Sequence, residues 1–276
     1  IPGTLRTRFE GKQQELVPES VFGNPGWSLN DKEIILYDQY DLWAISPDGK
    51  NARKLTHGRE QHIMYRIADI PAKKRKYLLY DAPILQEFDL DKGLLLRARG
   101  YDEKTGYFKW NKKSGEKAVS YNDSFVDEVR FDKNSSSIFF REQKFNMPPR
   151  LMTSKAQSST FSFFKSNPQQ DKYFWGRSEL VEFQNSKGQN LKAVLLYPAN
   201  YDPSKKYPMI VNIYEGKARE MHQYQNPTLF NEGGLNVTLM TLKGYFVLLP
   251  DIKLAFQNPG ISAADCVISA TEKIIK

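Results

Sequence analysis

The chain has 276 residues, of which 40% are hydrophobic and 13% aromatic, a balance typical of a folded protein that excludes a disordered one. Its net charge is +8, but the basic residues are dispersed and the densest run, 73–76, precedes an apolar stretch, so the sequence argues against nucleic-acid binding. No run reaches about eighteen apolar residues, so no membrane span is predicted.

Residues 1 to about 175 contain only strand and turn signals. Short runs rich in β-branched and aromatic residues are separated by turns at intervals of about eight to twelve residues, which indicates a propeller or a sandwich. A hairpin turn is expected at Asp48-Gly49. The predicted strands are 6–10, 14–17, 33–38, 41–46, 52–56, 77–81, 94–99, 106–111, 117–121, 126–131, 137–142 and 150–154. The polar stretch 155–176 is expected to hold a last strand and a crossover.

The pattern changes near residue 178. Residues 179–184 and 191–197 predict a β-hairpin around a turn that ends at Gly188, and a loop follows at 198–203. We therefore predict two domains, 1–177 and 178–276.

Two apolar runs, Met209–Ile213 and Tyr245–Leu249, fit strands that are buried on both faces of a parallel sheet. Between them, residues 236–243 predict a short helix that Gly244 ends. A second helix is expected to begin at Ser262, its N-cap. The order strand, helix, strand, helix indicates an α/β layer.

The second helix is expected to present Val267, Ala270 and Ile274 on one face. Cys266, on the same helix, is the one cysteine of the chain. A single cysteine cannot form an internal disulfide. At its position on this helix, we expect Cys266 to be a small core residue.

The block from Asn212-Ile-Tyr-Glu-Gly216 to Pro259-Gly-x-Ser-x-x-Asp265 resembles the start of a prolyl oligopeptidase-family peptidase domain. The similarity is to the dipeptidyl peptidase IV branch. The hairpin residues Gly188–Pro198 resemble the entry hairpin of that domain, and Asp41-Leu-Trp-x-Ile-x-x-Asp-Gly49 resembles a blade of the family's β-propeller. The resemblance implies a mixed fold, with a partial propeller of about three blades over 1–177 and the N-terminal part of an α/β-hydrolase sheet over 178–276.

The family resemblance implies a serine peptidase that hydrolyses peptides through a Ser-His-Asp triad and an acyl-enzyme. It implies no metal or organic cofactor, is compatible with a homodimer, and favours a periplasmic or secreted location. It also implies that the chain begins partway through the propeller and ends before the nucleophile. We therefore expect these 276 residues alone to be inactive.

Tyr214 is the candidate catalytic residue, because it directly follows a predicted strand, where α/β proteins form ligand sites. The resemblance implies that its hydroxyl donates to the oxyanion of the tetrahedral intermediate. The sequence Tyr214-Glu-Gly-Lys217 departs from the family's usual Tyr-Gly-Gly-Pro, which leaves the loop's shape open. The alternative is a strand-end tyrosine with its hydroxyl in water.

No nucleophile, acid or base is identified. The nearest match to Gly-x-Ser-x-Gly, Gly260-Ile-Ser262-Ala-Ala264, lacks the second glycine, so Ser262 is interpreted as a helix cap. The three histidines, His57, His62 and His222, have no metal-ligand spacing, and the first two are expected at the surface.

The remaining charged candidates lie near Tyr214. By resemblance, Asp251 is a structural residue at a strand end. Glu215, Arg219 and Glu220 either line a substrate cleft or belong to a solvated loop.

Two other functions remain open at this stage. The propeller and hydrolase scaffold could be a non-catalytic protein-binding module, which the absence of a Gly-x-Ser-x-Gly serine from the whole protein would indicate. The third possibility is an all-β binding protein with an α/β tail, although a half-sheet would leave an unpaired edge.

Overall fold

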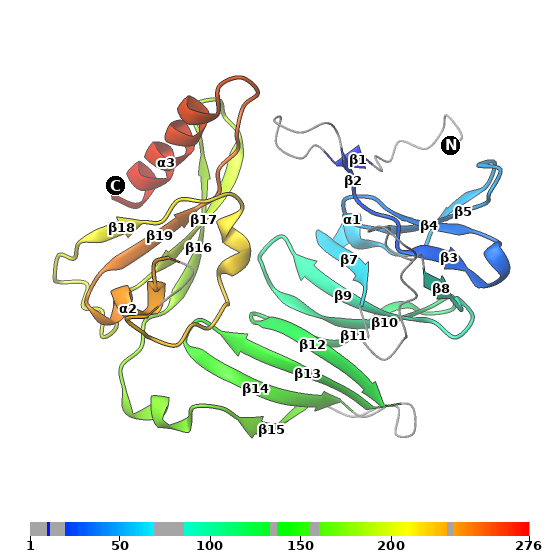
Figure 1. Ribbon diagram of the computed structural model, residues 1–276, viewed down its shortest axis with the longest axis horizontal. Coiled ribbons are helices and arrows are strands. Elements are labelled where there is room, and N and C mark those ends of the chain that lie inside the picture. Colours follow the sequence, from blue (N-terminus) through cyan, green and yellow to red (C-terminus); the bar gives the residue numbers. More distant parts are fainter. Residues whose placement is uncertain are drawn as a thin grey trace. The chain divides into compact units, whose positions relative to one another are not determined.

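We analysed a computed structural model of the chain, which describes residues 10–11, 20–68, 86–132, 137–154, 160–230 and 234–275. The protein is mostly β and divides into two compact units (Figure 1). Unit 1 contains Val17–Arg141 and Met152–Phe161, and unit 2 contains Glu142–Leu151 and Ser162–Lys276. The predicted strands 14–17 and 77–81 and the basic run 73–76 lie outside the described residues, as does 6–10 except for its last residue.

The first sheet of unit 1 has the strand order β6-β5-β4-β3-β8. Its turn between β5 and β6 was predicted: Gly49 adopts φ +70°, and its N–H donates to the carbonyl of Ser46 at 2.8 Å. The short helix α1 (Gly58–Gln61) follows β6. The sheet is made of β3 (Gly26–Ser28), β4 (Ile34–Tyr37), β5 (Leu42–Ile45), β6 (Ala52–Lys54) and β8 (Gln86–Phe88).

Two further sheets follow, with the orders β11-β10-β9-β7 and β12-β13-β14-β15. Most of their strands match the predicted ones within a few residues, but β7 was missed, as was β8 of the first sheet. The second sheet comprises β7 (Ile63–Ile67), β9 (Leu94–Gly100), β10 (Thr105–Asn111) and β11 (Gly115–Asn122). The third comprises β12 (Phe125–Asp132), β13 (Ser137–Lys144), β14 (Met147–Ser154) and β15 (Phe161–Lys165).

Each of these sheets packs its apolar face on the next. One buried cluster joins the first two sheets, with Ile35 and Leu42 from the first and Leu96 and Phe108 from the second. Another cluster joins the second and third sheets. In it, the rings of Tyr107 and Phe140 meet edge-on, with their centroids 5.5 Å apart. Successive small sheets of mostly antiparallel strands, stacked in sequence order, form a propeller-like all-β region.

Unit 2 is built on a four-stranded sheet with the order β16-β17-β19-β18. The hairpin of β16 (Ser178–Gln184) and β17 (Asn190–Leu196) was predicted. β19 (Phe246–Pro250) pairs antiparallel with β17 and parallel with β18 (Met209–Val211), so the sheet is mixed rather than parallel.

The prediction that 209–213 is a strand buried on both faces was wrong. β18 has three residues, all only half-buried, and lies at the end of the strand order, whereas β19 is central. β17, the second strand of the hairpin, occupies the interior position next to β19.

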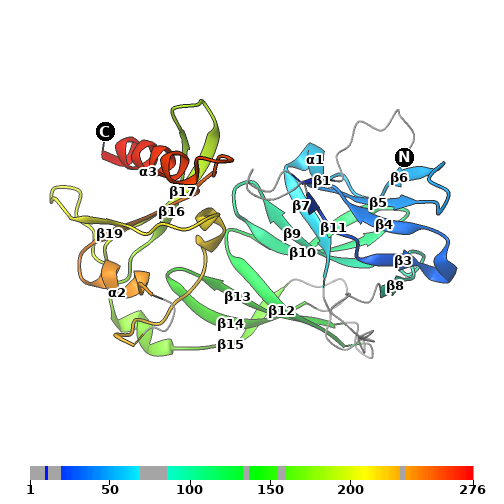
Figure 2. The same cartoon turned by 45° about the horizontal axis from the view of Figure 1, so that its top comes forward.

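Two helices cover opposite faces of this sheet (Figures 1 and 2). On one face, Val194 and Val247 pack with Val237 and Met240 of α2 (Val237–Leu242). On the other face, Leu195 and Leu248 pack with the α3 helix (Pro259–Ile275) through Ala270 and Ile274. The alternation of side chains between two helices explains why 193–196 of β17 and the whole of β19 are continuously apolar in sequence.

The helix starts are partly as expected. A short helix was predicted over 236–243, and α2 lies within that range. The side chain of Asn236 accepts a hydrogen bond from the N–H of Leu239 at 2.8 Å and caps α2, a role that was not predicted. The N-cap prediction for Ser262 was wrong, because α3 already begins at Pro259 and Ser262 lies buried inside its first turn. Among the described helices, none combines the length and apolarity needed to cross a bilayer.

Candidate functional site

The candidate site is the segment 212–222, here called the Tyr214 loop, which leaves the carboxyl end of β18. The N–H of Asn212 donates to the carbonyl of Leu248 at 2.9 Å, so the parallel pairing holds the chain up to the start of the loop. Beyond it, Ile213 and Tyr214 turn outward and are 54% and 68% exposed. The hydroxyl of Tyr214 forms no hydrogen bond with any residue that the structure describes. It is therefore a donor that an approaching ligand could use.

A 3-10 turn, η3 (Lys217–Glu220), fixes the far side of the Tyr214 loop. It begins after Gly216, whose φ of +61° lies in the left-handed region that favours glycine. The N–H of Ala218 donates to the Asp251 carboxylate at 2.8 Å. Asp251 follows β19, so neighbouring strand ends position the loop.

Lys217 places a positive charge beside Tyr214. Its ammonium nitrogen lies 5.7 Å from the centroid of the Tyr214 ring and 2.9 Å from both carboxylate oxygens of Glu220. A cation held at this distance favours negative charge that develops near the phenol, although Glu220 partly neutralises it.

A pocket of about 260 Å³ adjoins the loop inside unit 2. Asn212, Lys217, Glu220 and Tyr224 supply polar groups to its wall, and Val237 and Leu249 are part of its apolar lining. Tyr214 is not among the lining residues, so the structure does not bring its hydroxyl into this pocket.

The other charged candidates near Tyr214 separate into two groups. Glu220 lines the pocket. Glu215 and Arg219 are exposed. Within the described ranges, no group of three or more His, Cys, Asp or Glu side chains could hold a metal ion.

Ser262 is held by local hydrogen bonds. Its side chain is buried. The hydroxyl accepts a hydrogen bond from the N–H of Ala255 at 2.9 Å and donates one to the carbonyl of Asn258, also at 2.9 Å. A serine engaged in this way stabilises the start of α3 and is not presented to a substrate. Ser262 was interpreted as a helix cap, but it lies one turn inside α3, where its hydroxyl bonds to backbone groups near the helix start.

The three histidines differ in exposure and in the unit to which they belong. His222 is buried at the end of the Tyr214 loop, with 4% of its surface exposed. His57 and His62 are exposed, as predicted, and belong to unit 1.

Tyr214 stays a predicted site residue, and the contacts that hold its loop were not predicted. Asp251 was recognised as a structural strand-end residue, yet its partner Ala218 is 33 positions away. The signals that were available are a polar residue, Asp251, directly after a buried strand and a glycine, Gly216, two residues before Ala218 in a polar loop.

Neither a family model nor a curated protein matches the sequence. Solved structures do match. A provisionally assigned dipeptidyl aminopeptidase IV from Bacteroides ovatus is 17% identical and aligns with 96% of the chain at a TM-score of 0.62. The acylaminoacyl peptidase of Pyrococcus horikoshii is 10% identical over 94% of the chain, with a TM-score of 0.57. A puromycin-hydrolyzing peptidase of Mycobacterium tuberculosis is 10% identical over 94%, with a TM-score of 0.55.

At these identities the similarity is one of fold. The chain spans 40%, 39% and 41% of the lengths of those three proteins. The similarity therefore supports a shared arrangement of an all-β region followed by a layered sheet, and leaves activity to be argued from the site.

Proposed function

We propose that the chain is part of a serine-type peptidase of the prolyl oligopeptidase family, in the dipeptidyl peptidase IV-like branch. The observation that carries the proposal is the order of two architectures in one chain: stacked antiparallel sheets, then a sheet with helices on both faces. Fold similarity to solved peptidases over 96% of the chain supports it. In this proposal, residues 1–177 form about three propeller blades and residues 178–276 form the N-terminal part of an α/β-hydrolase domain.

The proposed role of Tyr214 is oxyanion stabilisation. During acyl transfer, the carbonyl oxygen of the scissile peptide bond gains negative charge, and a phenol O–H that points at it donates a hydrogen bond that strengthens in the transition state. The exposed, unengaged hydroxyl of Tyr214, the ammonium of Lys217 beside its ring, and the anchored η3 turn all suit this role.

The nucleophile, acid and base are proposed to lie outside these residues. The 276 residues contain no Gly-x-Ser-x-Gly, and Ser262 is held within a helix start. We therefore propose that the chain alone does not hydrolyse peptides, that peptides are the substrates of the whole protein, and that no cofactor takes part.

The proposal is tested with a fluorophosphonate, which attaches covalently to activated serines. We expect the protein purified from its natural source to be labelled at a serine outside residues 1–276, and the 276-residue chain to remain unlabelled. Labelling of Ser262 would contradict the assignment of catalysis to other residues. An unlabelled natural protein that also fails to cleave peptides would contradict the peptidase proposal and favour the non-catalytic binding module.

The role of Tyr214 is tested separately in the active natural protein. Tyr214→Phe removes only the hydroxyl, so we expect kcat to fall about 10²–10³-fold while KM changes little. An unchanged kcat would contradict the oxyanion role and support the alternative of a tyrosine with its hydroxyl in water.

A further inference from the structure

A short stretch of unit 2 places four large aromatic side chains on the surface, and each of them is between 52% and 71% exposed. Single exposed rings are common on proteins, but a contiguous group marks a site that meets a ligand, a protein or a membrane. Two exposed lysines lie in the same stretch. The six residues of this patch, here called the aromatic edge, are Phe163, Phe164, Lys165, Lys172, Tyr173 and Phe174.

The backbone that carries the aromatic edge is held along one side of β14 and the turn before it. β15 pairs with β14, and Figure 1 shows the chain continuing from β15 along this side. Ser166, just after β15, donates its N–H and its hydroxyl to the carbonyl of Pro149, at 3.1 and 2.6 Å. Trp175 donates its ring N–H to the carbonyl of Phe145 at 3.1 Å. Both aromatic pairs therefore lie on the same edge of the sheet, on an ordered backbone.

The rings of the aromatic edge favour an apolar partner. Three of the four belong to phenylalanines, which have no hydrogen-bonding group, so a carbohydrate or another polar ligand would gain little from them. None of the four lines the pocket beside the Tyr214 loop. The rings therefore offer an apolar surface rather than part of that cavity.

The lysines of the aromatic edge favour a membrane over a protein as that partner. Lys165 and Lys172 are exposed, and neither forms an ion pair with a residue that the structure describes. Asp171 is the one acidic residue within 163–174, so two lysines and one aspartate leave a net charge of +1. Protein interfaces are depleted in lysine, whereas aromatic rings combined with basic residues are typical of surfaces that lie on a membrane.

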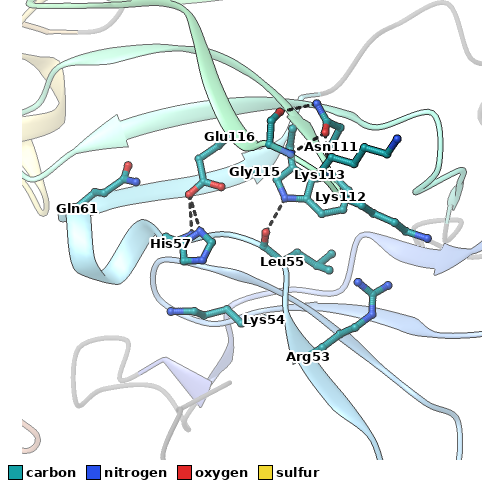
Figure 3. Close-up of a pocket in the computed structure, with 12 residues that line it drawn as sticks. Arg53, Lys54, Leu55, His57, Gln61, Asn111, Lys112, Lys113, Gly115 and Glu116 are labelled. Atoms are coloured by element: carbon teal, nitrogen blue, oxygen red, sulfur yellow. Dashed lines mark hydrogen bonds and ion pairs between the residues drawn. The ribbon is translucent and has the colours of Figure 1, made fainter.

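A second group of basic side chains, in unit 1, is largely paired. It lines a pocket of about 570 Å³ (Figure 3). Glu116 adds a buried carboxylate to the pocket wall and accepts a hydrogen bond from the N–H of His57 at 2.8 Å, as the dashed lines in Figure 3 show. This pocket therefore offers little uncompensated positive charge to an anionic surface. Three of its four lysines and arginines form ion pairs: Arg53 with Glu33, Lys54 with Glu60, and Lys112 with Asp91.

We propose that the aromatic edge binds the surface of a lipid bilayer that contains anionic headgroups. The phenylalanine rings enter the boundary between headgroups and acyl chains, and the hydroxyl of Tyr173 stays at the headgroups. Lys165 and Lys172 remain at the level of the headgroup phosphates and pair with them. The inference goes beyond the proposed peptidase function and does not rest on it, because membrane binding and labelling by a fluorophosphonate are measured independently.

The first test is flotation of the chain with vesicles of phosphatidylcholine, alone or with about one third phosphatidylglycerol. We expect binding to the anionic vesicles at submillimolar lipid, and about fivefold weaker binding to the neutral ones, because the edge carries one net positive charge. No binding to anionic vesicles at millimolar lipid would overturn the proposal.

Two further outcomes of this test would also overturn the proposal. If the chain forms a dimer without lipid, and the dimer is lost when rings of the aromatic edge are replaced, the edge binds a second copy instead. If protein purified from its natural source fails to bind the anionic vesicles, the edge is covered in the whole protein.

The contribution of the rings is tested with the double variant Phe164→Ser and Phe174→Ser. We expect its affinity for anionic vesicles to fall about tenfold or more, because two apolar side chains no longer leave water. The control is Ile261→Ser with Ile268→Ser, which removes two exposed apolar side chains of α3 outside the edge and should change affinity less than about twofold. An equal loss in both double variants would mean that exposed apolar surface adsorbs without a specific site.

The contribution of the lysines is tested with Lys165→Gln and Lys172→Gln together. Affinity for anionic vesicles should fall about fivefold or more, while affinity for neutral vesicles stays nearly constant. Lys187→Gln with Lys206→Gln is the control, because it lowers the net charge by the same amount at two exposed lysines of unit 2 outside the edge. Equal losses in both pairs would overturn the assignment of binding to the aromatic edge, since the charge of the whole chain would then explain it.

Discussion

The carboxylate of Asp251 accepts a hydrogen bond of 2.8 Å from the backbone N–H of Ala218, which joins the end of β19 to the turn that follows Tyr214. Ala218 is 2% exposed and lies in the short turn η3, where the first N–H groups have no partner within the helix. The bond therefore satisfies a buried donor and fixes where the Tyr214 loop returns to the sheet.

Asp251→Ala should loosen this loop. The substitution leaves the Ala218 N–H buried without this acceptor, which we expect to lower the free energy of unfolding by about 1–3 kcal/mol. Amide hydrogen exchange at Ala218 should become faster, because its donor group opens more easily. Glu215→Ala, an exposed acidic residue of the same loop, should leave stability within about 0.5 kcal/mol. Unchanged exchange at Ala218 in the Asp251 variant would contradict the anchoring role.

Gly216→Ala tests the backbone of the same loop. Gly216 has φ +61°, and a Cβ there would meet nothing within 4 Å, so any cost arises from the backbone and not from a clash. We expect a loss of about 1–2 kcal/mol in urea denaturation, the cost of a left-handed alanine.

Gly260→Ala is the matched control for Gly216→Ala. It also has open space at its Cβ, but it lies in helix α3 and lacks a positive φ. We expect a gain of about 0.4–1 kcal/mol, because alanine restricts the unfolded chain. Equal effects of both substitutions would show that the conformation of Gly216 is not as described.

The strands with a clear local signal could be predicted from the sequence. β9 alternates between buried and half-buried positions over its whole length, and β19 is a short apolar run with four of its five residues buried. β7 also carries an alternating pattern, Ile63, Tyr65 and Ile67, which the sequence analysis did not use. β8 has three residues and lies parallel to β3, some sixty positions earlier in the chain, so no local pattern could indicate it.

The contacts of the candidate site also divide into those with a local signal in the sequence and those without one. The position of Tyr214 follows from the strand before it, which is a local property. The support by Asp251 and the pair of Glu116 with His57 join residues 33 and 59 positions apart, so they depend on how the sheets pack. The length of β18 was overestimated because Ile213 is apolar, but its side chain is 54% exposed and lies in the loop.

Buried tyrosines should make unit 1 sensitive to alkaline pH. Burial is the largest cause that raises the pKa of Tyr37, Tyr65 and Tyr107, and it raises the pKa of Tyr121 to about 12. A raised folded-state pKa gives a contribution to stability that is fully present below the unfolded value of about 10 and is lost as the pH rises through the folded value.

The urea midpoint should therefore fall as the pH is raised above about 10. Tyr121→Phe removes one of the titrating groups, so its midpoint should fall less steeply over the same range, up to the folded-state pKa of about 12. Absorbance at the phenolate band, followed in parallel, should show Tyr121 ionising well above the pH of an unfolded tyrosine. A midpoint that is independent of pH over this range would contradict the burial of these hydroxyls.

Leu248→Ala should cost much of the stability of unit 2. Leu248 is fully buried in β19 and packs on the α3 face of the sheet. We expect a loss of about 2–5 kcal/mol in urea denaturation, from lost burial and the cavity that remains. Ile268 of α3 is 56% exposed, so Ile268→Ala should change stability by about 0.5 kcal/mol or less. A similar loss in both variants would mean that α3 packs on the sheet through its other side.

The thiol of Cys266 reports whether α3 stays on the sheet. Its side chain is fully buried, with Sγ 3.9 Å from Asn185 Nδ2 and 4.0 Å from the carbonyl of Lys253. A disulfide reagent such as DTNB should not react with the native protein and should react with one thiol per chain once denaturant unfolds it, because a buried thiol is inaccessible. In Leu248→Ala, where the contact beneath α3 is weakened, the reaction should begin at lower urea concentrations than in the unmodified chain. Immediate reaction of the native, unmodified chain would show that α3 detaches readily and that the two-sided layer of unit 2 is not stable by itself.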